Sequence, residues 1–66
     1  MSDYNFTEVE IEVLKLIVKG LEDIEIACML EIEEDSAREI AENILAKLEA
    51  RNKIQAAIKA VKAELV

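Results

Sequence analysis

Residues 21–48 read LEDIEIACMLEIEEDSAREIAENILAKL, and this stretch decides the fold. Its apolar residues recur every three to four positions, which is the spacing of a helix with one buried face. The pattern predicts a short helix over residues 23–30 and a longer helix over residues 34–48. The three residues 31–33 leave room only for a tight turn, in which the side chain of Ile32 is expected to be buried against the core. The residues expected on the inner faces are Ile26, Ala27 and Leu30 in the short helix, and Ala37, Ile40, Ala41, Ile44, Leu45 and Leu48 in the longer one.

The segment before this stretch predicts a helix over residues 7–19 with a complete set of start signals. Thr7 is placed to cap the helix, and Glu10 at the third helical position closes a capping box with it. Phe6 and Ile11 flank the cap and are expected to pack together as a hydrophobic staple.

The segment after it predicts a fourth helix over residues 52–64. Asn52 is a favourable N-cap, and Gln55 follows three residues later. The apolar residues of this helix are Ile54, Ala57, Ile58, Val61 and Leu65. Because the chain has no internal repeat, linker or low-complexity stretch, residues 1–66 are expected to form one all-α, four-helix domain.

The composition agrees with an all-helical chain. Hydrophobic residues make up 53% of it, with one Phe, one Tyr and no Trp, so the core must be aliphatic. The only glycine, Gly20, supplies the left-handed residue that ends the first helix, and there is no proline. No apolar run approaches the roughly 20 residues of a membrane span, and no signal peptide is visible. A cytoplasmic location and no membrane partner are therefore expected if the chain is natural.

Charge is distributed unevenly along the chain. Residues 1–30 hold seven acids against two lysines, residues 31–42 six acids against one arginine, and residues 43–66 five basic residues against two acids. The three segments therefore carry −5, −5 and +3, which gives the net charge of −7. Affinity for nucleic acid comes largely from cationic groups that displace counterions from phosphates. The longer helix of the central stretch offers few of them.

Catalysis is not expected. The chain has no His for acid–base chemistry near neutral pH. Cys28 has no base within sequence reach, so a buried structural thiol is favoured over a nucleophile, and Met29 is interpreted as a gap-filling core residue. The acids Glu33, Glu34 and Asp35 are better explained by their favourable position at a helix start than by metal binding. We expect no metal, cofactor or small-molecule ligand.

Three segments together resemble the LuxR/GerE type of helix-turn-helix domain. They are FTEVEIEVLKLIVKGL at residues 6–21, Glu-Ile-Ala-Cys-Met-Leu-Glu-Ile at residues 25–32, and Asn-Ile-Leu-Ala-Lys-Leu at residues 43–48. The similarity covers residues 6–66 without a gap. It implies a DNA-binding module of a bacterial transcription regulator, in which the longer helix enters the major groove and the fourth helix pairs two copies.

The resemblance places the DNA-contacting positions on the longer helix. The residues that fall at these positions are Ser36, Arg38, Glu39, Glu42 and Lys47, flanked by Glu34 and Asp35, with Lys53 as a further match to a contact residue. In the family such positions are commonly basic, polar or small, and here several are acidic. Like charges juxtaposed at an interface cost several kcal/mol, so we expect little or no binding to duplex DNA.

Three interpretations of function follow. The first is a designed, stability-optimised sequence on a LuxR-type backbone that retains neither DNA binding nor catalysis, because every local signal agrees with the fold. The second is the DNA-binding regulator module that the family implies. The third is an acidic partner that pairs with a LuxR-type regulator through the fourth helix. The candidate pairing face, for this or for a weak homodimer of an otherwise monomeric chain, is Ile54, Ile58, Val61 and Leu65, and the competing interpretation of these residues is an ordinary intramolecular core.

Overall fold

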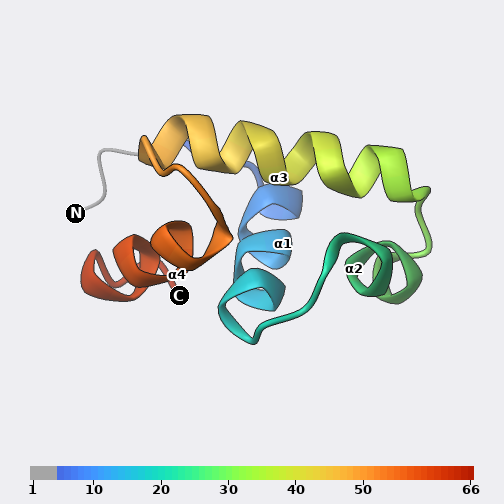
Figure 1. The fold of residues 1–66 in the computed structure, drawn as a ribbon, viewed down its shortest axis with the longest axis horizontal. Coiled ribbons are helices and arrows are strands. Elements are labelled where there is room, and N and C mark those ends of the chain that lie inside the picture. The colour runs from blue at the N-terminus through green and yellow to red at the C-terminus, as the bar shows by residue number, and fades with distance from the viewer. Residues whose placement is uncertain (1–4) are drawn as a thin grey trace.

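Four helices are present in the computed structural model, which describes residues 5–66. They are α1 (Glu8–Val18), α2 (Asp23–Leu30), α3 (Glu34–Leu48) and α4 (Lys53–Lys62). The long helix α3 lies along one side of the molecule, with α2 near one end, α4 near the other and α1 between them (Figure 1). Residues 1–4, which the predicted domain includes, lie outside the described residues. The all-α, four-helix fold class is confirmed.

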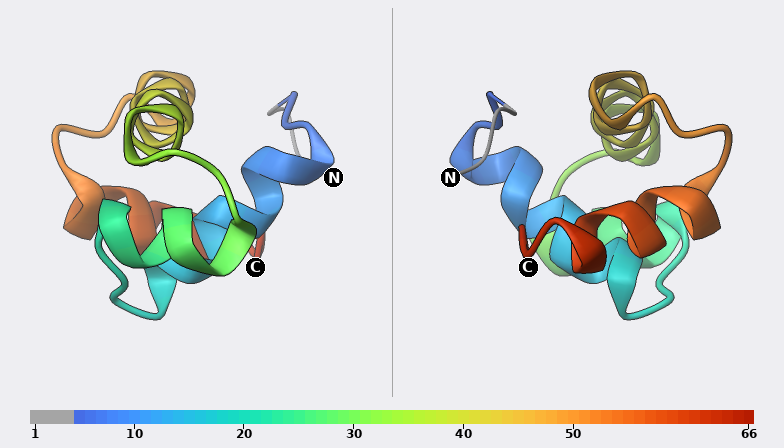
Figure 2. Two further views of the ribbon diagram at one scale, coloured as in Figure 1. Left: turned by 90° about the vertical axis from the view of Figure 1, so that its right-hand side faces the viewer. Right: turned by 90° about the vertical axis from the view of Figure 1, so that its left-hand side faces the viewer.

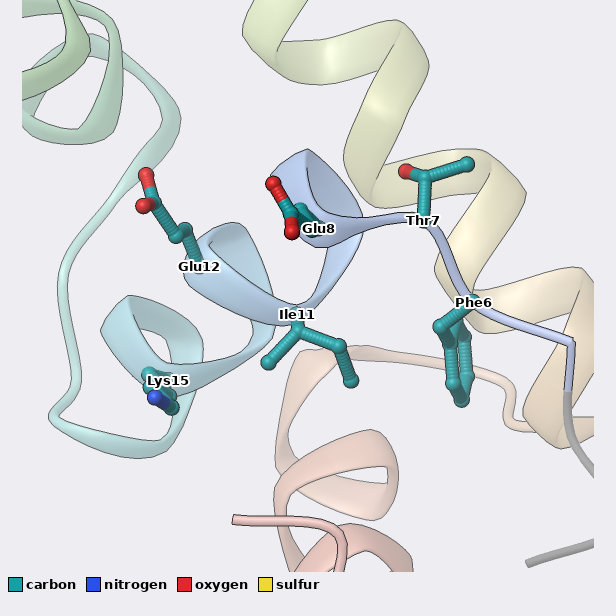
Figure 3. Close-up of a pocket in the computed structure, with 6 residues that line it drawn as sticks. All are labelled: Phe6, Thr7, Glu8, Ile11, Glu12 and Lys15. Carbon is teal, nitrogen blue, oxygen red and sulfur yellow. The ribbon is translucent and has the colours of Figure 1, made fainter.

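The start of α1 is the capping box that the sequence predicts. The Thr7 hydroxyl accepts from the Glu10 amide at 3.1 Å, and the Glu10 carboxylate accepts from the Thr7 amide at 2.9 Å. Phe6 and Ile11 project on the same side of the chain beside this cap, as a hydrophobic staple requires (Figure 3). At the other end, Gly20 has a φ of 94°, which ends the helix in a left-handed turn.

The helices α2 and α3 begin and end at the predicted residues, but their ends are made by glutamates. Glu31 follows α2 with a φ of 57°, and Glu49 follows α3 with a φ of 54°. The left-handed conformation costs an L-residue with a side chain about 1–2 kcal/mol. The Ile32 amide donates to the Ala27 carbonyl at 2.9 Å and closes the turn. Ile32 packs against the core as predicted, but its side chain is half-buried and not fully buried.

The core is filled by large side chains from α1, α2 and α3, whereas α4 contributes alanines. The largest fully buried side chains are Val13, Leu14, Ile26, Ile44 and Leu48. From α4 the fully buried residues are Ala56 and Ala60. Small residues on the inner face let α4 lie close to α1 and α3. The large apolar residues of α4 consequently remain outside.

The interpretation as intramolecular core is therefore wrong for Ile54, Ile58 and Val61, whereas Leu65 does pack against the core. Ile54 is 73% exposed, Ile58 50% and Val61 55%, while Leu65 is half-buried. The helix also ends two residues earlier than predicted, at Lys62.

Two predictions for α2 are also wrong. Cys28 is exposed rather than buried, and Met29 is 62% exposed rather than part of the core. Successive residues of a helix are rotated by about 100°. Because Ile26 and Ala27 face inward, Cys28 and Met29 are carried to the opposite side.

Candidate nucleic-acid interface

The outer face of α3 carries the positions that the sequence predicts to contact DNA. Seen along its axis, α3 stands apart at the top of the molecule, with α1, α2 and α4 below it (Figure 2). Its exposed residues are Glu34, Asp35, Ser36, Arg38, Glu39, Glu42, Asn43, Ala46 and Lys47. The described parts of α1, α2 and α4 therefore leave this side of α3 open to a large partner.

Carboxylates occupy the centre of this face. Each residue of a helix is rotated by about 100° around the helix axis from the one before it. On this count, a sector of roughly 60° opposite the buried residues of α3 contains Asp35, Glu39, Glu42 and Ala46. Arg38 lies on the side nearest α2, and Lys47 lies on the other side. The five predicted DNA-contacting residues of α3 are thus all exposed, and the acidic ones point most directly outward. Lys53, the further match, is half-buried at the start of α4.

The guanidinium of Arg38 is surrounded by carboxylates of its own chain. Its terminal nitrogens lie 3.0 Å from Asp35 Oδ1 and 3.5 Å from Glu34 Oε2, and its Nε lies 3.9 Å from Asp23 Oδ2. Each such surface pair is worth about 0–1 kcal/mol, so the arginine is not locked in place. Its positive charge is nevertheless balanced locally, and a phosphate would have to compete with three acids.

Lys47 forms a link between α3 and the start of α1. Its ammonium donates to the Glu10 carboxylate at 2.7 Å and to the Asn5 carbonyl at 2.8 Å. It also lies 5.4 Å from the centre of the Phe6 ring, within the range of a cation–π interaction. Lys47 therefore serves the packing of the N-terminal segment on α3.

The partner of Lys47 is nearly buried. Glu10 is 8% exposed. The hydrogen bond from Lys47 and that from the Thr7 amide lower the pKa of Glu10, while burial opposes them in the raising direction. Glu10 is thus charged at neutral pH, in the form that holds both the capping box and Lys47.

Asp23 makes a second ionic link, between the starts of α2 and α4. Its Oδ1 lies 2.5 Å from Lys53 Nζ, and its Oδ2 faces Arg38. This Oδ1 is buried and has no hydrogen-bond partner among residues 5–66. Its negative charge is balanced chiefly by the ammonium of Lys53. The structure thus places each of the three candidate cations Arg38, Lys47 and Lys53 beside a carboxylate.

Sequence reasoning missed Glu10 and Asp23 as partners of these cations. Glu10 was recognised as a cap, and its position gives no signal of contact with a lysine 37 residues away. Asp23 is the first residue of α2, where an acid is favourable at a helix start whether or not cations lie nearby, so its position does not indicate two cationic neighbours.

The other surface features of residues 5–66 bring no set of reactive side chains together. The hollow beside the start of α1, about 460 Å³, is lined by Phe6, Thr7, Glu8, Ile11, Glu12 and Lys15 (Figure 3). The side chains of Glu8, Glu12 and Lys15 project separately from the outer side of α1 in that view. Among residues 5–66 no cluster of three or more Cys, Asp or Glu side chains is arranged to hold a metal. In the same range no helix has the length and apolar character needed to cross a membrane.

The short α2, the tight turn and the longer α3, braced by α1 and α4, define a helix-turn-helix domain. The sequence profile of the luxR family of bacterial regulatory proteins (GerE) matches residues 4–60, and the chain belongs to this family. The search of the curated proteins finds no match.

Proposed function

We propose that this LuxR-family domain acts through protein contact on the outer face of α4 and does not insert α3 into DNA. The observation that carries the proposal is the acidic centre of the α3 face, formed by Asp35, Glu39 and Glu42. Four exposed carboxylates of α3, these three and Glu34, stand against the single guanidinium of Arg38. Lys47 is directed toward Glu10.

The free energies involved favour repulsion between α3 and duplex DNA over binding. Non-specific binding to duplex DNA is worth about 5–8 kcal/mol, corresponding to Kd values of roughly 10⁻⁴–10⁻⁶ M. Like charges facing one another at an interface cost several kcal/mol. Because the two quantities are similar in size and opposite in sign, little net affinity remains for a duplex.

The exposed side of α4 supports the other half of the proposal. Ile54, Ile58 and Val61 are each at least half exposed. They lie three or four residues apart and therefore share one face of the helix. A continuous exposed apolar surface of this kind typically marks a protein interaction site.

Fluorescence anisotropy with labelled duplex DNA tests the proposal. At about 50 mM salt, where phosphate contacts are strongest, we expect no saturable binding by the wild-type chain up to roughly 1 mM protein. Saturable binding at micromolar protein that weakens steeply with salt would overturn the proposal.

The second candidate is DNA binding through Ser36, Arg38, Glu39, Glu42 and Lys47, which membership of the family favours. Glutamate can accept a hydrogen bond from the amino group of cytosine, so an acid in the groove is compatible with specific recognition when cations surround it. This function predicts that Arg38→Ala reduces affinity for duplex DNA by about 1–3 kcal/mol. The same anisotropy titration measures that loss.

A designed origin is supported by the agreement between local signals and the fold, but other features count against a stability-optimised design. Glu31, Glu49 and Glu64 all have positive φ values between 54° and 57°, where design practice uses glycine. Cys28 is a free exposed thiol, which design practice avoids. A melting temperature within about 45–65 °C would agree with an ordinary mesophile chain, and one above about 90 °C would favour design.

A further inference from the structure

An apolar groove lies between the end of α1 and the outer side of α4, which is the neighbour of α1 on the side away from α2 (Figure 1). Two adjoining hollows of about 290 and 380 Å³ form it, and Val18 and Val61 line both of them. Ile58, Val61 and Val66 are each at least 40% exposed. We call this surface the α1–α4 groove, and its apolar floor consists of Val18, Ala57, Ile58, Val61 and Val66.

Lysines form the rim of the α1–α4 groove. Lys15 lies in the last turn of α1, Lys19 is the cap of that helix, and Lys62 is the last residue of α4. Among residues 5–66, these three are the charged side chains that line the two hollows. Within the same range none of them has a carboxylate at ion-pair distance. In a protein whose net charge is −7, the groove therefore combines an apolar floor with a cationic rim.

Acids line the neighbouring hollows but not this groove. Glu22 lines the hollow of about 360 Å³ toward the start of α4, together with Lys53. Glu12 lines a hollow between α1 and α2, and Glu64 is exposed after the end of α4 without lining either hollow of the groove. At physiological salt, exposed charges more than about 8 Å apart are largely screened from one another. A small partner seated in the groove is therefore influenced mainly by the three lysines.

We propose that the α1–α4 groove binds an acidic amphipathic helix of a partner protein. This inference rests on the proposed function, since it names the kind of partner that the outer face of α4 contacts. The apolar residues of an amphipathic helix recur every three or four positions, so two successive ones can occupy the two adjoining hollows. The carboxylates beside them then meet the ammonium groups of the rim, which gives the contact its complementary charge.

The charge of the groove favours this partner over a second copy of the chain. The family resemblance implies that the fourth helix pairs two copies. In a two-fold pairing, the second copy would bring the same three lysines to the contact, and juxtaposed like charges are unfavourable. An acidic helix in the groove covers Ile58 and Val61, which belong to the predicted pairing face. Binding of the acidic helix and pairing of two copies therefore exclude one another.

The shape of the groove and the total charge of the chain favour a helix over a lipid surface. A helix with its side chains is about 10–12 Å across, so it can enter a hollow between two helices, whereas a bilayer presents a broad, flat surface. An anionic bilayer would also face many of the acids of a chain with a net charge of −7. A single helix avoids most of them.

Fluorescence anisotropy on the full chain at about 150 mM salt, where only nearby charges interact, tests the inference with two synthetic peptides. Both are labelled with fluorescein, are about 18 residues long so that they can form a helix, and carry leucine at every third or fourth position. One has glutamate at the flanking positions and the other has lysine. We expect saturable binding of the acidic peptide with a Kd of about 100 µM or below, and binding of the basic peptide at least about tenfold weaker.

Single substitutions identify the surface that binds the acidic peptide. Lys62→Glu should weaken binding about three- to tenfold, because it replaces an attraction by a repulsion. Arg51→Glu is the matched control, since Arg51 is exposed, lines neither hollow of the groove, and gives the same change in net charge; it should bind as the wild type does. Ile58→Ser removes an apolar residue of the floor and should weaken binding at least about tenfold.

The decisive variant is Lys19→Glu with Lys62→Glu, which reverses the charge of the rim on both helices and leaves the apolar floor unchanged. Its affinity should fall at least about tenfold for the acidic peptide and rise at least about tenfold for the basic peptide. Both lysines are exposed, so circular dichroism should find the fold unchanged. A variant that is merely unfolded would gain no ligand, which separates charge recognition from loss of structure.

The contrary results differ from one another. Equal binding of the two peptides, or binding of neither up to about 1 mM protein, overturns the inference. A wild-type dimer in sedimentation equilibrium that the acidic peptide does not dissociate also overturns it, although protein contact through α4 then stands. Binding to vesicles of phosphatidylcholine with about one quarter phosphatidylglycerol, without a preference between the peptides, overturns it in favour of a lipid surface. Saturable binding to duplex DNA at micromolar protein refutes the proposed function, whatever the peptides do.

Discussion

Replacement of Lys47 by methionine separates a structural role from a DNA-contacting one. The substitution keeps the length of the side chain and removes its charge, so the Glu10 carboxylate loses its partner while remaining nearly buried. Breaking a fully buried ion pair from one side costs about 3–5 kcal/mol. The Lys47 side chain is 36% exposed, and solvent screening reduces the cost. We therefore expect a loss of about 1–2 kcal/mol in the free energy of unfolding.

The assay is thermal and urea unfolding followed by circular dichroism. For a domain of this size, 1 kcal/mol corresponds to a shift in Tm of about 4–8 °C. Lys62→Met is the matched control, because Lys62 is exposed and has no ion-pair partner among the described residues. A Lys47→Met variant that unfolds like this control would refute the structural role that the geometry assigns to Lys47.

The pH dependence provides an independent check on the same pair. The pKa of Glu10 is lowered in the folded state, so the folded protein binds fewer protons than the unfolded chain in this range. The stabilisation by Glu10 is then fully present above the unfolded pKa of about 4.3–4.5, and it is lost as the pH falls through the lower folded pKa. Lys47→Met should flatten this acid-side loss, and an unchanged pH profile would contradict the assignment.

Three further predictions concern backbone and packing, each measured as the free energy of unfolding in urea. Glu31→Gly and Glu49→Gly should each stabilise the chain by about 0.5–1 kcal/mol, because glycine relieves the positive φ; Glu39→Gly, in the middle of α3, should instead destabilise it by about 1 kcal/mol. Gly20→Ala should cost about 1 kcal/mol from its φ of 94° alone, since an added Cβ would meet no atom within 4 Å; a neutral result would refute this. Ala60→Leu should cost about 1–3 kcal/mol, because Ala60 is fully buried against the core, and a stabilised variant would show that α4 packs more loosely.

Local signals in the sequence were sufficient for most helix ends, although α4 ends at Lys62, two residues earlier than predicted. Thr7 with Glu10, Gly20 and Asn52 specify helix ends through hydrogen bonds within a few residues, and each end lies where these residues place it. The family resemblance rested on the same inward-facing pattern, and the family is confirmed.

The packing of α4 required information that a local pattern does not contain. Its large apolar residues recur at helical spacing, which usually indicates a buried stripe. Here Ala56 and Ala60 form the buried face instead, because a closely packed helix needs small residues at its contact. The isoleucine and valine residues of α4 therefore form a second, exposed apolar face of the helix and are not part of the core.

The ionic links of the candidate site were also beyond the sequence. Lys47 and Glu10 are 37 residues apart, and only the crossing of α1 and α3 brings them together. Asp23, Arg38 and Lys53 likewise come from three different helices, and only the packing of α2, α3 and α4 brings them together. The charge of the α3 face could be counted in advance, whereas the local balancing of its cations could not.

We propose that the exposed carboxylates of α3 keep the domain off DNA. The most direct measurement compares duplex affinity at about 50 mM salt for the wild type and for the triple variant Asp35→Asn, Glu39→Gln, Glu42→Gln. This substitution removes three negative charges from exposed positions and leaves the core unchanged. We predict no saturable binding by the wild type up to roughly 1 mM protein and saturable binding by the triple variant at about 0.1 mM or below, a gain of at least tenfold or about 1.4 kcal/mol. A wild type that binds at micromolar concentration, or a triple variant that binds no better, would contradict this prediction.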